Sequence, residues 1–290
     1  MLNKDIIVQS EIISNAKVNI GLNISAKLDN NYHKIETLIQ EVSLSDEISI
    51  KIYQRRGNIK ILQEGINIEC AEEQNTCYVI ANFLKKKFNL KNKITIKIKK
   101  NIPIGSGLGG GSSNAAATLR CLDENLQLCM SKIEKNKMCT SIGMDVPFFL
   151  DGGLQFAENM GEKLKPISSI FRKHFFLLVF PRFGISTSWA YNHINKRLPS
   201  KKKLYNLLAL KETINFDLFG NDFETIVIPR YPEIGEIKKL LLSSNALFSS
   251  LSGSGSTVFG IFKNFDDVLK ASELLKQKKY HSTIAHPVYR

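Results

Sequence analysis

The chain has 290 residues, of which 43% are hydrophobic and 23% are charged. This composition excludes an intrinsically disordered protein, and the length is sufficient for two domains of ordinary size. The formal net charge is +13, from 40 Lys and Arg against 27 Asp and Glu. Basic clusters such as Lys97 with Lys99-Lys100 lie at expected element ends and carry no interleaved aromatic residues. A solvated basic surface is therefore favoured over a nucleic-acid-binding surface.

The cysteines and the N-terminal residues bear on the cellular compartment. Five cysteines occur without a CxxC pair, which disfavours a zinc site and favours free thiols in a reducing cytosol. The first ten residues, MLNKDIIVQS, contain no apolar signal-peptide core. The longest apolar run, 175–180, is too short to cross a bilayer. We therefore expect a cytoplasmic protein with no membrane partner.

The first half of the chain combines strands with three helices. Alternating or β-branched runs predict strands over 12–24, 47–53, 58–62 and 93–99. Residues 77–88 have the apolar spacing of a helix and end in lysines, which suit a helix C-terminus. A helix is also expected over 114–122, with Ser112 or Ser113 as its N-cap, and a shorter one over 131–140.

The second half of the chain has a different order of elements. An apolar strand at 175–180 is followed by helical segments through Trp189 and 204–210. The elements expected after these are a helix at 232–243, strands flanking Ser252–Gly255, a helix at 266–278 and a strand near 283–288. This order is typical of helices packed on one face of an antiparallel sheet. We expect two domains, residues 1–162 and residues 163–290.

The segment 105–111, GSGLGGG, places five glycines in seven residues directly before an expected helix. Glycine loses more conformational entropy on folding than any other residue, so this cluster needs a compensating use. A flexible linker is disfavoured because a strand and a helix bracket the segment closely. A cradle for a phosphate group is favoured, because inward-turned N–H groups and the following helix N-terminus both bind anions.

The residues around the glycines distinguish two common phosphate-binding motifs. A Walker A loop is excluded, because Ser112-Ser113 follow the last glycine in place of Lys-Ser or Lys-Thr. Gly105, Gly107 and Gly110 satisfy the GxGxxG pattern of dinucleotide-binding proteins. The acidic residues about twenty positions later follow a helix and not a strand, so this second motif is disfavoured.

The segment 103–116, PIGSGLGGGSSNAA, resembles the signature loop of the GHMP kinases, which include galactokinase, homoserine kinase and mevalonate kinase. Further motifs follow the order of this family, most closely that of its branch acting on 4-diphosphocytidyl-2-C-methyl-D-erythritol. They are NAKVN at 15–19, NYH at 31–33 with ETL at 36–38, GMDVPFF at 143–149, AENMGE at 157–162 and SGSGSTVF at 252–259. On these ordered matches the chain is identified as a member of the GHMP kinases.

The resemblance implies an α+β, two-domain GHMP kinase fold. It implies an N-terminal ribosomal protein S5 domain 2-like ATP-binding domain and a C-terminal ferredoxin-like α/β domain. It also implies phosphoryl transfer from ATP to the 2-hydroxyl of 4-diphosphocytidyl-2-C-methyl-D-erythritol in the non-mevalonate isoprenoid pathway, with Mg²⁺ expected from ATP chemistry. Homoserine or a mevalonate as acceptor is one alternative, and a nucleic-acid-binding protein with this fold is another. The metal ligands, the adenine-selecting residues and the oligomeric state stay open.

The resemblance assigns site residues to two catalytic and two binding roles. Asp145 is the candidate catalytic base or orienting group, and Lys17 is expected beside it, where a cation keeps the carboxylate ionised. The ATP phosphates are assigned to Pro103, Ile104, Gly105, Ser106, Gly107, Leu108, Gly109, Gly110, Gly111, Ser112 and Ser113. The substrate is assigned to Asn19, Tyr32, His33 and Tyr191, with an aromatic ring stacked on cytosine and His33 bonded to its edge.

Two positions depart from the family pattern. Asn30-Asn31 stand where the family has Asp-Gly, and Asn159 stands where it has a glycine. Asparagine tolerates left-handed backbone geometry, so we expect the turn at Asn30-Asn31 to persist, whereas Asn159 is expected to change a loop. Neither departure changes a catalytic group.

Overall fold

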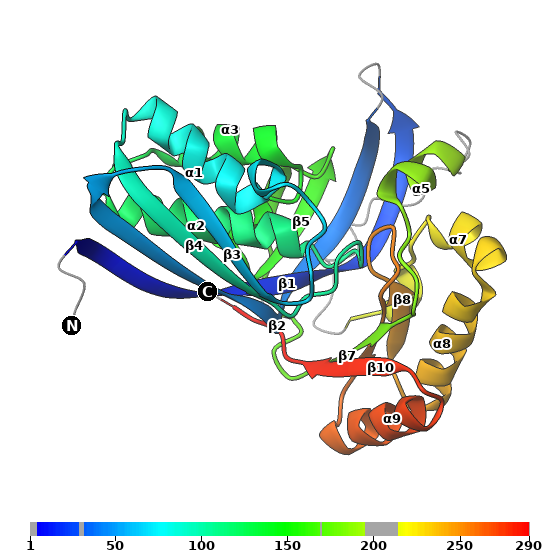
Figure 1. Ribbon diagram of the computed structural model, residues 1–290. Helices are drawn as coiled ribbons and strands as arrows, with labels where there is room; N and C mark the ends of the chain where they lie inside the picture. Colours follow the sequence, from blue (N-terminus) through cyan, green and yellow to red (C-terminus); the bar gives the residue numbers. More distant parts are fainter. Residues whose placement is uncertain (1–4, 29–31, 169, 195–213, 290) are drawn as a thin grey trace. The chain divides into compact units, whose positions relative to one another are not determined.

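The computed structural model describes residues 5–28, 32–168, 170–194 and 214–289 (Figure 1). The turn expected at Asn30-Asn31 and the helical segment expected at 204–210 lie outside these residues. Contacts divide the chain into two compact units that are interleaved in sequence. Unit 1 comprises Met1–Ala16, Ser45–Ile104 and Gly109–Asp151, and unit 2 comprises Lys17–Leu44, Gly105–Leu108 and Gly152–Arg290. The boundary expected at residue 162 stays a prediction.

Strands of unit 1 form a sheet whose buried face is almost purely isoleucine. Strand β3 (Ile59–Gly65) runs parallel to β4 (Asn92–Lys100), which pairs antiparallel with the C-terminal half of β2 (His33–Arg56). Strand β1 (Ile6–Lys27) also pairs with β2. Alternate residues of β4 are fully buried, namely Ile94, Ile96 and Ile98. The period-two alternation read from the sequence therefore gives the correct strand.

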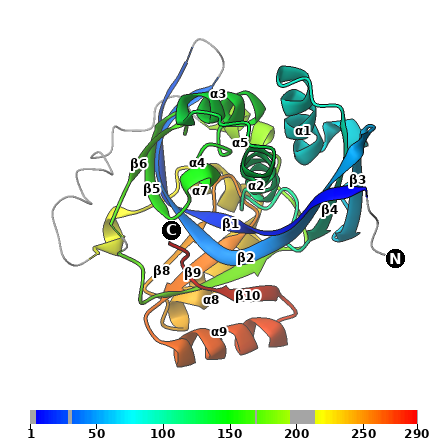
Figure 2. The same ribbon diagram turned by 90° about the vertical axis from the view of Figure 1, so that its left-hand side faces the viewer.

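Helices cover one face of this sheet in unit 1. They are α1 (Thr76–Lys87), α2 (Gly110–Asn125), α3 (Lys132–Ile142) and the short α4 (Phe148–Asp151), preceded by the 3₁₀ turn η1 (Glu72–Gln74). Helices α1 and α2 lie side by side over the sheet (Figures 1 and 2). The helix expected over 77–88 is confirmed: Ile80 and Leu84 of its apolar spacing are buried, whereas Phe83 is exposed.

The start of α2 corrects one expectation. The helix begins at Gly110, and its N-cap is Gly109 with φ +69°, so the assignment of the N-cap to Ser112 or Ser113 is wrong. The amide of Ser113 already donates an intrahelical bond to the Gly109 carbonyl at 2.9 Å. A serine is favoured as N-cap because its side chain can accept a hydrogen bond from the first turn. Here the N-cap is a left-handed glycine, and no side chain caps the helix.

Unit 2 contains a four-stranded antiparallel sheet. Its order is β10 (His281–Ala285), β7 (Phe175–Phe180), β9 (Val258–Phe262) and β8 (Phe248–Leu251). Helices α8 (Pro232–Ser243) and α9 (Phe265–Gln277) pack against it and against each other (Figure 1). Helices on one face of an antiparallel sheet were expected, and this arrangement is confirmed.

The remaining elements of unit 2 connect this sheet with β1 and β2. Strands β5 (Leu154–Asn159) and β6 (Lys163–Pro166) extend from the N-terminal half of β2. The connecting helices are α5 (Thr187–His193), η2 (Phe216–Leu218) and α7 (Glu224–Arg230). Among the described residues, no helix combines the length and the apolar character that a membrane span requires.

The core of unit 2 is formed where α8 and α9 meet the sheet. Val179 and Phe262 of the sheet, Leu241 of α8 and Val268 of α9 belong to one buried apolar cluster. Complete burial of a side chain of this size contributes about 1.5–3 kcal/mol to folding. This packing gives a rigid base to the β8–β9 connection, which carries the SGSGS motif.

All five cysteines are free thiols. Burial raises the pKa of Cys77 to about 12, and it likewise raises the pKa of Cys139 to about 12. Thiolate is the reactive form of cysteine, so neither side chain is a nucleophile at neutral pH. Their role is that of small core residues.

Candidate active site

The first half of the glycine segment, Gly105–Leu108, is held by the β8–β9 connection. Thr257 donates its N–H to the Ser106 carbonyl at 3.1 Å, and Ser252 donates its hydroxyl to the Gly107 carbonyl at 2.9 Å. Gly107 has φ +78°, and a Cβ built on it would lie 2.0 Å from the Ser252 carbonyl oxygen. Only glycine permits this backbone approach.

The second half, from Gly109 onward, forms the first turn of α2. The unpaired N–H groups and the positive dipole end of a helix make this turn an anion-binding element. Thr76 of α1 supports it by donating its hydroxyl to the Gly111 carbonyl at 2.8 Å. The first turn of α2 is therefore suited to an anion, and phosphate binding by the glycine segment stays a prediction.

The two serines that follow the glycines have different surroundings. The hydroxyl of Ser113 is buried and accepts a hydrogen bond from Ser14 at 2.7 Å. The Ser112 side chain is partly exposed, and its Oγ lies 4.0 Å from where a Cβ of Gly143 would be. Ser112 thus faces the segment that carries Asp145, whereas Ser113 has a structural contact.

Asp145 lies in the turn between α3 and α4 and is partly buried. The amide of Val146 closes this turn by donating to the Gly143 carbonyl at 3.1 Å. Arg120, on α2, donates to the Phe149 carbonyl just beyond the turn. Helix α2 therefore holds both the anion-binding turn at its start and, through Arg120, the segment with the candidate base.

Lys17 is 3% exposed on β1, and its ammonium group is oriented by a neighbouring amide. Its Nζ donates to Asn19 Oδ1 at 2.5 Å, and Asn19 Nδ2 donates to Thr37 Oγ1 at 3.0 Å. A buried ammonium group needs such partners, because its desolvation is costly. The Lys17 N–H also donates to the Leu108 carbonyl at 3.0 Å, which ties β1 to the glycine segment. Asn19 thus orients Lys17, and its assignment to substrate stays a prediction.

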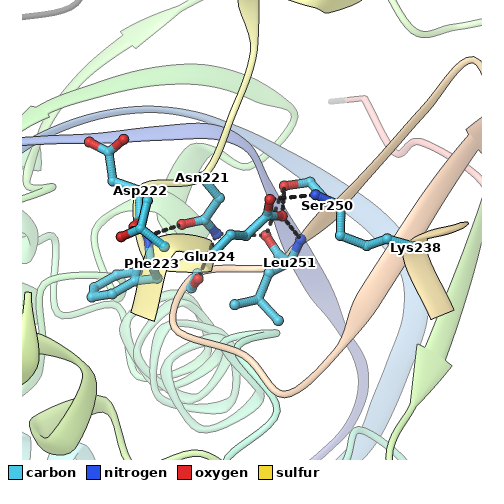
Figure 3. Close-up of polar contacts among 9 residues, drawn as sticks. Asn221, Asp222, Phe223, Glu224, Lys238, Ser250 and Leu251 are labelled. Carbon is cyan, nitrogen blue, oxygen red and sulfur yellow. Dashed lines mark hydrogen bonds and ion pairs between the residues drawn. The ribbon is translucent and has the colours of Figure 1, made fainter. Parts of the chain in front are cut away.

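Sequence reasoning missed Asn221, which fixes the β8–β9 connection by hydrogen bonds to its backbone. Its Nδ2 donates to the carbonyls of Leu251 and Gly253, at 2.8 and 2.7 Å, and its Oδ1 accepts the Phe223 N–H at 3.0 Å (Figure 3). Gly253 in turn packs on the Lys17 side chain, since a Cβ built there would lie 3.6 Å from Nζ. Asn221 therefore fixes the backbone of a glycine that lies beside Asn19 and Lys17.

Two acidic neighbours of Asn221 complete this network. Glu224 accepts hydrogen bonds from the Ser250 hydroxyl and the Leu251 N–H, both at 2.9 Å, and pairs with Lys238 (Figure 3). Asp222 accepts the Ile24 N–H of β1 at 2.7 Å. The only signal in the sequence was a short polar run, Asn-Asp-Phe-Glu, beside a hydrophobic segment. Its partners lie too far along the chain for any local pattern to reveal them.

Two of the residues assigned to the substrate meet in unit 2. The rings of His33 and Tyr191 stack with centroids 5.2 Å apart and an interplanar angle of 25°. Phe223 packs edge-on against Tyr191 at 4.9 Å. Tyr32 precedes the stacked pair in sequence and is 48% exposed. The structure thus brings His33 and Tyr191 together, and Tyr32 is adjacent to His33 in the chain.

Asn159, at the end of β5, occupies a left-handed conformation with φ +69°. Its Nδ2 donates to Glu162 Oε1 at 2.5 Å, which closes the turn. This explains how asparagine replaces the glycine of the family pattern. The substitution therefore keeps a left-handed turn at this position, where a changed loop was expected from the sequence.

Comparisons with known proteins identify the family. The model of the GHMP kinases N terminal domain matches residues 75–153, and that of the GHMP kinases C terminal domain matches residues 202–281. A 4-diphosphocytidyl-2-C-methyl-D-erythritol kinase of Azobacteroides pseudotrichonymphae is 38% identical over 86% of this chain and 92% of its own length. The chain belongs to the GHMP kinases. Another kinase of that name, from Pelodictyon phaeoclathratiforme, is 35% identical over 94% of this GHMP kinase and 95% of the relative.

Solved structures agree with the assignment to the GHMP kinases. The crystal structure of a 4-(cytidine 5'-diphospho)-2C-methyl-D-erythritol kinase has a TM-score of 0.76, with 25% identity, over 96% of this chain and 99% of the other. A homoserine kinase from Cytophaga hutchinsonii has a TM-score of 0.70 at 17% identity, over 95% of each chain, and supports the fold alone. The two-domain GHMP kinase fold expected from the motifs is confirmed, and the protein is a small-molecule kinase.

Proposed function

We propose that this GHMP kinase transfers the γ-phosphoryl group of ATP to the 2-hydroxyl of 4-diphosphocytidyl-2-C-methyl-D-erythritol, in the non-mevalonate isoprenoid pathway. One observation carries the proposal. Relatives that match this chain over nearly their whole length are named as kinases of this acceptor, at 32–38% identity. A cytoplasmic location and independence from nucleic acid and membrane remain predictions.

The glycine segment is proposed to hold the phosphates of ATP through its backbone. Gly105 supports this role, because its φ is +62° and, apart from its two neighbours in the chain, no described residue has a heavy atom within 4 Å of a Cβ built there. The first turn of α2 adds its N–H groups and its positive dipole end. The open space at Gly105 and the positive end of α2 are each suited to a phosphate group.

Magnesium is proposed to bind together with ATP. The described residues contain no group of three His, Cys, Asp or Glu side chains that could hold a metal ion. This fits Mg²⁺ in kinases, which relies mainly on substrate phosphates and water for its ligands. The hydroxyl of Ser112 is proposed to face the magnesium ion. When bound, this ion would neutralise part of the phosphate charge.

Asp145 and Lys17 are proposed as the catalytic residues. Asp145 would accept or orient the proton of the attacking hydroxyl, and Lys17 would keep this carboxylate ionised and stabilise developing charge. Asn19 supports the role of Lys17 by fixing the direction of its Nζ. Protein groups in phosphoryl transfer mainly position the reactants and stabilise charge, and these residue types suit both tasks.

The cytidine diphosphate end of the acceptor is proposed to bind near Tyr32, His33 and Tyr191. The exposed ring of Tyr32 suits stacking on cytosine, and the ring nitrogens of His33 suit a hydrogen bond to its edge. Tyr191 supports His33 by the stacking described above.

The test is coupled ADP release with magnesium-ATP and the proposed acceptor, comparing wild type with Asp145→Asn. We expect rapid turnover by the wild type and a loss of about a hundredfold or more in the variant, because positioned acid–base groups contribute that much. The matched control is Asp151→Asn, since Asp151 is a solvent-exposed carboxylate of the same segment, paired with Lys132. Unchanged turnover in Asp145→Asn would refute the assigned mechanism.

The acceptor is tested separately from the mechanism. Homoserine and mevalonate at equal concentration should give negligible ADP release, whereas the cytidyl acceptor should be consumed. Faster turnover of either alternative would refute the proposed acceptor and keep the kinase. A salt-dependent shift of a labelled oligonucleotide at micromolar protein, without acceptor turnover, would favour nucleic-acid binding instead.

A further inference from the structure

A buried ion pair lies where the glycine segment becomes α2. Lys100 Nζ is 2.6 Å from Asp46 Oδ2, and the two side chains are 4% and 0% exposed. Burial lowers the pKa of Lys100, an effect that the Asp46 carboxylate opposes. Because desolvating two charges is costly, a buried ion pair is weak evidence for stabilisation and suggests another role.

Asp46 connects three parts of the chain through its carboxylate. Its Oδ1 accepts the N–H groups of Asn101 and Ile102, at 2.7 and 2.8 Å, where the chain leaves β4. Its Oδ2 accepts Asn114 Nδ2 of α2 at 3.0 Å, in addition to Lys100. One carboxylate therefore fixes the residues before and after the glycine segment.

Lys100 lies directly beneath the first residue of α2. A Cβ built on Gly110 would be 2.8 Å from Lys100 Nζ. The ammonium group is thus close both to the Asp46 carboxylate and to the turn at which the proposed function places nucleotide phosphates. An unscreened carboxylate at this depth would repel those phosphates strongly, because the interior has a low dielectric constant.

We propose that Asp46 and Lys100 are positioning residues of the nucleotide site, in which Asp46 fixes the glycine segment and Lys100 screens this carboxylate from bound phosphates. The inference rests on the proposed binding of ATP. Screening predicts effects on nucleotide affinity that depend on the sign of the charge left behind. A purely structural role predicts losses that follow stability alone.

The experiment measures the binding of ADP and of adenosine by titration calorimetry, together with thermal unfolding. We expect Lys100→Met to weaken ADP at least tenfold, because it leaves a buried carboxylate beneath the phosphates. Asp46→Asn keeps an acceptor oxygen for the N–H groups of Asn101 and Ile102 and removes only the negative charge, so ADP affinity should stay within threefold of wild type or become tighter, although both variants unfold at lower temperature. Adenosine, which carries no phosphate, should bind all variants within twofold of wild type.

The double variant Asp46→Asn/Lys100→Met supplies the rescue. It removes both charges, so ADP affinity should return to within threefold of wild type. The matched control is the exposed pair of the neighbouring register position, Lys99 and Glu47, whose charged atoms are 2.8 Å apart. Lys99→Met should change neither ADP affinity nor the unfolding temperature appreciably.

Each outcome decides the inference. Equal losses of ADP and adenosine affinity in both single variants, or an unchanged ADP affinity in Lys100→Met, would overturn it. If Lys100→Met does not fold, Lys100→Gln replaces it, and the double variant must still bind ADP. A wild-type protein that binds no ADP would refute the proposed function as well, which separates that failure from failure of the inference alone.

Discussion

The two halves of the glycine segment share a composition but are built for different reasons. Gly105–Leu108 is fixed by backbone contacts with the β8–β9 connection, and Gly107 must be glycine because a carbonyl oxygen occupies the space of its Cβ. The half that begins at Gly109 is fixed by α2 and, beneath it, by the Lys100–Asp46 pair. Each glycine of this segment is thus needed for its own reason, and a substitution by alanine tests each reason separately.

Gly107→Ala should have the largest effect. The left-handed conformation costs roughly 1–2 kcal/mol for an L-residue, and the contact with Ser252 is with backbone, which cannot rotate away. We expect a loss of about 3 kcal/mol in the free energy of unfolding and at least a tenfold loss in kcat/KM. Urea denaturation and coupled ADP release provide the two measurements. An unchanged urea midpoint would contradict the close approach.

Gly105→Ala sharpens the comparison, because Gly105 has a similar φ but open space around it. We expect a loss of only about 1 kcal/mol in unfolding free energy, from the backbone conformation alone. The KM for ATP should nevertheless rise several-fold, since the methyl group would enter the space proposed for phosphates. Urea denaturation and ATP titration of the initial rate measure both. If Gly105→Ala lost as much unfolding free energy as Gly107→Ala, the contact with Ser252 would not explain the greater sensitivity expected at Gly107.

Thr76→Val should have the smallest effect and probes the second half. The substitution removes the 2.8 Å hydrogen bond to the Gly111 carbonyl but keeps the shape of the side chain. An exposed hydrogen bond contributes about 0.5–1.5 kcal/mol, and water replaces it here, so the lower end is expected. Thermal unfolding should shift slightly, and kcat/KM should stay within about threefold of wild type on that energy. A tenfold loss would mean that α1, and not α2, sets the geometry of this half.

Local patterns predicted α1, α8, α9, β4 and β7, but they missed β5, β6 and the N-terminal half of β2. The apolar run 175–180 became β7, which is buried on both faces, and the pattern at 232–243 became α8, which is buried on one face. The N-cap of α2 was wrong because serine usually caps helices, whereas the left-handed glycine here does so. The motif residues were found only through family resemblance, and the contact expected between Lys17 and Asp145 stays a prediction.

The residues that hold the site were harder to predict. Asn221 bonds to carbonyls about thirty positions away, which no local pattern encodes. Lys100 was grouped with Lys97 and Lys99 as a solvated cluster, and for Lys100 this was wrong. The sequence did indicate its burial, because Lys100 falls on the same face of β4 as the buried isoleucines, whereas Lys97 and Lys99 fall on the other face. A charged residue on the apolar face of a strand indicates a buried partner.

The Lys100–Asp46 pair also constrains how this sequence can change over generations. Replacing either residue alone leaves a buried charge unmatched, so a single substitution at one position passes through a destabilised intermediate. A lineage can reach a neutral pair only by two changes close together in time. Positions 46 and 100 should therefore vary jointly among descendants, whereas the exposed Glu47 and Lys99 should drift independently.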